Sequence, residues 1–251
     1  MEAMTPSDLL AIGAIVFGAF VARGMTGFGS ATLAVPMLVH FIPLRTAVPL
    51  LLVLDFASSI VLLRIDRSKI DRSEVAWLLP FAMCGVALGV TLLVRLPATW
   101  LLASLGVVVI VFGLRALAAR PGQRRVSRAW VVPAGLAGGT LGGIFGSGAA
   151  TPFMIYLTHR LPDRTRVRAT FSAFALFDYA FRLVVFAVGG LLFSALSLET
   201  AAVGFPAMAA GLFVGDRVHG RIGDETARRA IAALLVVAGI LLIVKARSLA
   251  S

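Results

Sequence analysis

Four charged residues stand inside or beside the apolar stretches of this 251-residue chain. An ionised side chain is costly in hydrocarbon and usually faces a partner or a water-filled cavity. Asp55 and Asp178 are therefore candidate proton acceptors, and Arg23 and Arg182 are candidate contacts for an anion. Arg182 follows Asp178 by four positions, so a purely structural ion pair is an alternative. Arg23 equally fits a side chain that extends to the membrane interface.

A glycine-rich stretch occurs twice. Gly24 to Val48 (GMTGFGSATLAVPMLVHFIPLRTAV) aligns without gaps on Gly143 to Val167 (GIFGSGAATPFMIYLTHRLPDRTRV) at a shift of 119, and 11 of the 25 pairs are identical. Glycine, histidine, proline and arginine account for seven of those pairs, which shared apolar bias does not explain. Further matches follow at a shift of 123, around Asp55 and Asp178. Later in each half, matches follow at a shift of 126. The pattern indicates a duplicated membrane unit.

Each glycine cluster interrupts an apolar stretch, and this predicts a broken helix. Backbone that leaves a helix inside a membrane must be satisfied by protein or by a water-filled cavity. The helices that restart near Ser30 and Ala149 would direct N-terminal amides, with their partial positive charge, towards an anion. Tight helix packing through small residues is the alternative. The expected anion contacts at the two breaks are Gly27, Phe28, Gly29, Ser30 and Thr32, and Gly146, Ser147, Gly148 and Thr151.

The composition is that of a multispanning membrane protein. The chain is 59% hydrophobic and 14% charged, with a mean hydropathy of +0.98. The net charge of +11 resides in short clusters between apolar runs without interleaved aromatic residues, so we expect no nucleic-acid partner. The sequence offers no CxxC, HExxH or carboxylate cluster, and we expect neither a metal nor a cofactor.

The apolar pattern predicts an all-α integral membrane protein. It consists of two inverted repeats, residues 1–120 and 121–251, that form one membrane domain. Each repeat has a broken, re-entrant pair of half-helices, Asp8–Ile42 or Ala129–Leu161, followed by about three spans. The six expected spans are Thr46–Leu63, Val75–Val94 (broken by Pro80 and Gly85), Ala98–Leu114, Ala169–Val188, Thr200–Gly215 and Ala227–Val244.

The distribution of basic residues favours this arrangement. With three crossings per half, one side of the membrane receives 17 basic residues and the other receives 4. If each broken stretch crosses once, the sides receive 11 and 10. The positive-inside rule prefers the first arrangement, in which the halves are inverted. Ten crossings would give the same parity, and only the short second piece of the first stretch, Ser30 to Ile42, argues against them.

The two motifs, GMTGFGSATLAVPML and GIFGSGAATPFMIYL, resemble the signature motifs of the TauE/SafE family of membrane anion transporters, often described as sulfite exporters. The resemblance implies a secondary transporter for sulfite, sulfoacetate or other organosulfonates in the bacterial inner membrane, surrounded by lipid. It leaves open whether the protein forms a homo-oligomer. Many relatives carry three consecutive glycines where this chain has Gly29-Ser30-Ala31 and Gly148-Ala149-Ala150. The intramembrane aspartates favour proton coupling.

Three other functional classes are alternatives to a carrier. A passive anion channel fits the same residues, and a structural scaffold is a weaker possibility. An intramembrane hydrolase is suggested only by Ser147, because a nucleophile elbow needs glycine two positions before and after the serine, where this chain has Phe145 and Ala149. We therefore expect a carrier and not an enzyme.

Overall fold

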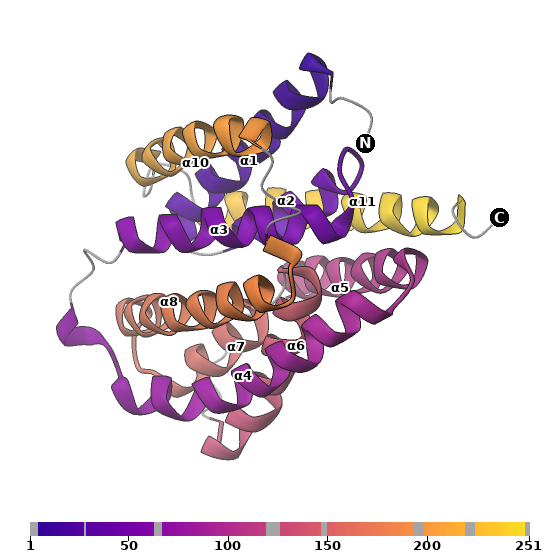
Figure 1. Cartoon of the computed structure of the whole chain (residues 1–251). Coiled ribbons are helices and arrows are strands. Elements are labelled where there is room, and N and C mark those ends of the chain that lie inside the picture. Colours follow the sequence, from indigo (N-terminus) through magenta and orange to yellow (C-terminus); the bar gives the residue numbers. More distant parts are fainter. Residues whose placement is uncertain are drawn as a thin grey trace.

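The computed structural model describes residues 5–27, 29–62, 67–118, 126–146, 150–192, 198–218 and 224–248, and all their regular structure is helical (Figure 1). Ser147, Gly148 and Phe28 lie outside these residues, as does 119–125 of the expected link between the halves. The helices of the first half are α1 (Pro6–Thr26), α2 (Ser30–Leu38), α3 (Leu44–Leu62), η1 (Arg67–Lys69), α4 (Arg72–Arg95) and α5 (Ala98–Ala118). Those of the second are η2 (Arg128–Trp130), α6 (Val131–Phe145), α7 (Ala150–Arg160), α8 (Arg164–Val188), α10 (Leu198–Val218) and α11 (Asp224–Ser248).

The expectation of an all-α integral membrane protein is confirmed. Among the described residues, six helical segments are long and apolar enough to cross a membrane: Pro6–Met25, Leu44–Val61, Arg72–Arg95, Ala98–Arg115, Thr165–Val188 and Glu199–Val218. This set differs from the expected six, since it contains α1 and does not contain α11.

The broken pairs are less alike in length than the sequence suggested. With 21 residues, α1 reaches about 30 Å, enough to cross the hydrocarbon, and so it is longer than the half-helix expected there. Its partner α2 has only 9 residues and reaches about 14 Å. In the second pair α6 has 15 residues and α7 has 11. As described, neither α2 nor α7 is long enough to cross, and this argues against ten full crossings.

The predicted interruption of the second span is wrong. Helix α4 is continuous from Arg72 to Arg95, with Pro80 and Gly85 inside it. A proline is tolerated in a membrane helix because neighbouring groups satisfy the carbonyl that it leaves free. Gly85 serves packing, because a Cβ there would lie 2.5 Å from the carbonyl oxygen of Leu136 in α6.

The two halves pack against each other reciprocally. In Figure 1, α1 lies beside α10, and α4 lies beside α6, so the first helix of each half contacts the fourth helix of the other half. The third helices, α3 and α8, contact each other, as do the fifth helices, α5 and α11. The short helices follow the same pattern, since α2 contacts α3 and α7 contacts α8.

Candidate functional site

Two helix breaks form the framework of the site. Helix α1 ends at Gly27 (φ +86°), α2 begins after Gly29 (φ +91°), and α6 ends at Gly146 (φ +61°). Residues with a side chain rarely adopt such angles, so glycine is required at these positions. The amide of Gly27 donates to the carbonyl oxygen of Arg23 at 2.6 Å, and the amide of Gly146 donates to that of Gly142 at 2.8 Å. The two breaks therefore have the same backbone hydrogen bond.

Two other glycines of the repeated motif serve helix packing. A Cβ at Gly24 would lie 2.7 Å from the carbonyl oxygen of Leu212, and a Cβ at Gly143 would lie 2.7 Å from that of Val86. Both distances are too short for a side chain, so these residues allow α1 to approach α10 and α6 to approach α4. Breakage and packing thus both occur in the cluster, at different glycines, while anion contact at these residues stays a prediction.

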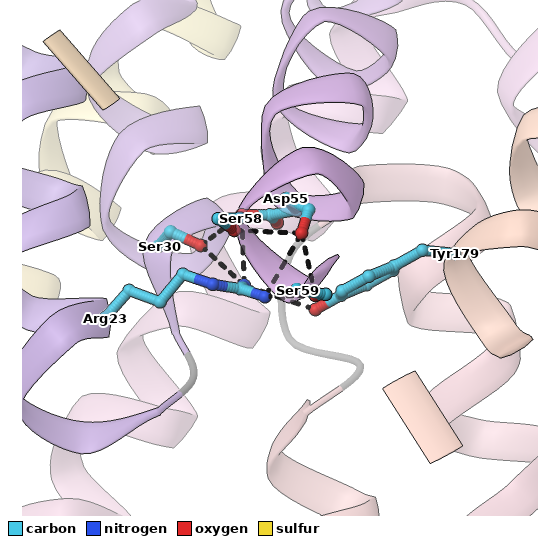
Figure 2. A network of polar contacts seen from close by, with 6 residues as sticks. All are labelled: Arg23, Ser30, Asp55, Ser58, Ser59 and Tyr179. Carbon is cyan, nitrogen blue, oxygen red and sulfur yellow. Dashed lines mark hydrogen bonds and ion pairs between the residues drawn. The ribbon is translucent and has the colours of Figure 1, made fainter. Parts of the chain in front are cut away.

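A buried polar network surrounds Arg23, whose side chain is 2% exposed. Its Nη1 donates to Oδ1 of Asp55 and to Oγ of Ser30, both at 3.1 Å (Figure 2). Its Nη2 donates to Oγ of Ser59 at 2.7 Å and to the backbone carbonyl of Asp55 at 3.3 Å. Arg23 therefore turns into the protein and does not extend to the membrane interface.

Serine hydroxyls complete this network. Ser30 Oγ, at the first residue of α2, donates to Asp55 Oδ1, so the carboxylate joins the start of α2 to the arginine. The hydroxyls of Ser58 and Ser59 donate to the carbonyl oxygen of Asp55 at 2.9 and 2.8 Å, within α3. Bonds of this kind satisfy polar groups inside a helix that water does not reach.

Tyr179 connects the network to the second half of the chain. Its hydroxyl accepts a hydrogen bond from Arg23 Nη1 at 3.4 Å, and the Cζ of Arg23 lies 5.6 Å from its ring centroid. On the same ring, the Cζ of Arg182 lies 5.7 Å from the centroid. Both arginines are within the range of a cation–π contact. One tyrosine of α8 is thus shared by a guanidinium from each half.

The second half supplies the ion pair that the four-residue spacing permits. Arg182 Nη2 contacts Oδ2 of Asp178, and both side chains are buried. This contact has the distance of an ion pair but not the geometry of a hydrogen bond. Among the described residues, Nε, Nη1 and Nη2 of Arg182 have no hydrogen-bond partner. The guanidinium packs on Gly142, where a Cβ would overlap it.

Comparison with known families finds a match for this chain. The model of the family described as sulfite exporter TauE/SafE matches residues 11–242, nearly the whole chain and both glycine motifs. The chain belongs to the TauE/SafE family. No curated protein and no solved structure matched it. This TauE/SafE protein is accordingly a multi-pass membrane transporter of sulfite-type anions, and membership of a transporter family counts against the hydrolase hypothesis.

Within this TauE/SafE protein, only some of the predicted site residues lie close to one another. Asp55, Arg23 and Ser30 meet in one network, and Asp178 and Arg182 form the neighbouring pair. Thr32 and Thr151 lie in the first turns of α2 and α7, partly buried. Phe28, Ser147 and Gly148 are outside the described residues, and their roles stay predictions.

Sequence reasoning missed Tyr179, Ser59 and Arg168. Arg168 was counted only as a basic residue near the membrane surface, yet a Cβ at Gly27 would lie 3.2 Å from its Nε, so it packs on the first break. The spacing from Arg168 to Arg182 is 14 residues, close to four helical turns, and this signal would have placed both on one side of α8. Tyr179 and Ser59 carried no such signal.

Proposed function

We propose that this TauE/SafE protein is a proton-coupled secondary transporter that moves small sulfur-containing anions across the bacterial inner membrane. Sulfite, sulfoacetate and other organosulfonates are the substrates that we consider. The observation that carries the proposal is the pair of buried arginine–aspartate contacts, one from each half, on the same tyrosine ring. Two guanidinium groups are not retained in a membrane without a role, because burying each charge is costly.

Anion binding follows from the chemistry of these groups. A guanidinium donates several charge-assisted hydrogen bonds in a planar arrangement that suits an oxyanion such as sulfite or a sulfonate. The starts of α2 and α7 add amide groups with a partial positive charge, next to glycines that allow close approach. Gly27, Gly29 and Gly146 have the left-handed conformation that such an approach requires, and Ser30 and Thr151 add hydroxyl groups.

Proton coupling follows from charge balance. With both aspartates ionised, Arg23, Asp55, Asp178 and Arg182 have no net charge, and their burial is tolerable. An added monoanion would leave one uncompensated negative charge in a medium of low dielectric constant. Protonation of Asp178 or Asp55 removes that charge, because burial and a nearby anion both favour the neutral carboxyl. The anion would then travel with one proton for each of its negative charges.

Alternating access is the step that the reciprocal packing supports. If the two repeats, 1–120 and 121–251, are inverted, the contacts of α1 with α10 and of α6 with α4 are equivalent by a two-fold axis in the membrane plane. Rocking of one half against the other would then expose the same residues to either side. The positive-inside rule assigns the side with most basic loops to the cytoplasm.

Transport by purified protein in liposomes tests the proposal. We expect uptake of ³⁵S-sulfite or radiolabelled sulfoacetate to exceed the outside concentration when a pH gradient is imposed, and to equilibrate without it. Uptake that only equilibrates under both conditions would show passive transport, by a channel or an uncoupled carrier, and would contradict proton coupling. Flux equal to that of empty liposomes for both anions would contradict the transport of these substrates altogether.

A further inference from the structure

The two halves place an arginine in equivalent contacts but take it from different helices. The shift of 119 relates Arg23 to Gly142, and the shift of 123 relates Ser59 to Arg182. Arg23 of α1 donates to Ser59 of α3, whereas Arg182 of α8 packs on Gly142 of α6. Each contact therefore contains one arginine and one small residue, with the two exchanged between halves.

The surroundings of the two arginines are otherwise equivalent. The carbonyl oxygens of Arg23 and Gly142 accept the amides of Gly27 and Gly146, so the backbone beside each guanidinium has the same form. Each guanidinium contacts the aspartate of its own half, Asp55 or Asp178, which the shift of 123 relates to each other. Both also contact the ring of Tyr179.

The two arginines differ in their hydrogen bonds. Arg23 donates to Ser30, Ser59 and Tyr179 and to both the side chain and the backbone of Asp55. At the positions equivalent to Ser30 and Ser59 the second half has Ala149 and Arg182, so the two serine hydroxyls of the first network have no counterpart there.

Arg182 consequently keeps donors that are not used. Arg182 is 0% exposed, and in the described part of the chain its Nε and Nη1 have no partner while Nη2 contacts only the Asp178 carboxylate, whereas in Arg23 only Nε lacks a hydrogen bond. Buried donors in proteins are almost always paired, so a fully buried guanidinium in this condition calls for an external acceptor.

We infer that Arg182 is the guanidinium that binds the transported anion, and that the first half holds a permanently filled copy of the same site. In that copy Asp55 Oδ1 takes the place of an oxyanion oxygen, because it accepts from Arg23 and from Ser30 at the start of α2. In the second half an oxygen of sulfite or of a sulfonate group would accept from Arg182 beside the start of α7. This inference rests on the proposed function and specifies which of two candidate arginines carries it.

Anion-dependent thermal stabilisation of the full chain in detergent tests the assignment. Sodium sulfite and sodium sulfoacetate are titrated against sodium chloride of equal ionic strength. We expect Arg182→Lys to weaken the apparent affinity at least about tenfold, because a lysine cannot replace the planar set of donors. Arg23→Lys should lower the unliganded Tm and change the affinity by less than about threefold, since its bonds are internal.

Arg45→Lys is the matched control, because Arg45 donates to the carbonyl oxygens of Leu93 and Val94 at the end of α4, outside both pairs. It should leave the affinity unchanged. Equal loss of affinity in Arg23→Lys and Arg182→Lys would overturn the assignment while leaving the proposed function intact. If neither anion stabilises the wild-type protein, and neither is transported by it in liposomes, the proposed function would instead be contradicted.

A double exchange tests the equivalence of the two contacts. Arg182→Ser alone should lose anion-dependent stabilisation, whereas Gly142→Arg combined with Arg182→Ser reproduces in the second half the arrangement of Arg23 and Ser59. We expect the double variant to recover an affinity within about tenfold of wild type, because the guanidinium returns to the same place from the opposite helix. A double variant with a wild-type Tm and no recovered affinity would overturn the inference.

Discussion

Arg160 donates from Nε and Nη2 to Oε1 of Glu74, at 3.1 and 2.8 Å, and so connects α7 of the second half to α4 of the first. Glu74 is 3% exposed, and its Oε2 accepts the hydroxyl of Tyr156 at 2.5 Å. The shift of 126 places Thr200 at the corresponding position of the other half. This ionic connection therefore has no sequence counterpart in the other half, and it lies among the most basic loops.

Replacement of Glu74 should destabilise the protein. In Glu74→Gln the partly exposed Arg160 and the buried Tyr156 lose their charged acceptor, and we expect a loss of about 1–3 kcal/mol of stability, because the buried Tyr156 hydroxyl and the partly screened guanidinium are left less well compensated. Thermal or denaturant unfolding in detergent measures this. Asp163→Asn is the control, since its pair with Arg166 is exposed and asparagine still caps α8. Equal stability of the two variants would show that the Glu74 contact is marginal.

Asp178→Asn should separate proton coupling from binding. An amide cannot take up a proton, so pH-driven accumulation of sulfite should be abolished, while exchange of labelled for unlabelled sulfite across the liposome membrane continues. Both rates are measured on the same preparation. Accumulation at the wild-type level would assign Asp178 to structure alone.

Transport should be electroneutral. The four buried charges balance before the anion arrives, and the site regains balance only if protons enter in number equal to the substrate charge. An imposed potassium diffusion potential with valinomycin should therefore leave the initial rate of sulfite uptake unchanged at constant pH. A rate that rises with an inside-positive potential would instead require fewer protons per anion.

Alanine at the packing glycines should destabilise both helix pairs. Gly24→Ala and Gly143→Ala each place a methyl group 2.7 Å from a carbonyl oxygen of the adjacent helix, and we expect a loss of about 1–3 kcal/mol in each. Gly18→Ala, in the same helix as Gly24, is the control, because no described atom lies within 4 Å of a Cβ at that position. Unfolding midpoints in detergent compare the three variants, and similar midpoints would show that the helices adjust without cost.

The sequence predicted the parts of the site that depend on short separations. Glycines at Gly27 and Gly146 interrupt helices locally, and Asp178 and Arg182 are one turn apart, so both features could be read without a fold. The duplication predicted equivalent α-helices in the two halves, and the contacts of α1 with α10 and of α4 with α6 fit it, while the inversion of the halves stays a prediction. The length of α1 was misjudged because Gly24 was taken as part of the break, whereas the helix continues to Thr26.

Contacts between distant segments could not be derived from the sequence. Arg23 and Asp55 are 32 positions apart, and Arg23 and Tyr179 are 156 apart, so their meeting depends on how α1, α3 and α8 are rotated about their axes. Ser59 appeared to be an ordinary residue of a span for the same reason. Helix rotation is set by many small packing contacts, including those at Gly24 and Gly143, which no local pattern reveals.

The exchange of arginine and small residue between the halves bears on how this duplicated chain has diverged. In this chain each half holds a positive charge at an equivalent place, although the charge is attached to α1 in one half and to α8 in the other. Related sequences should accordingly carry arginine at one member of the pair 23 and 59, and at one member of the pair 142 and 182, but seldom at both, because two guanidinium groups would repel each other in one contact.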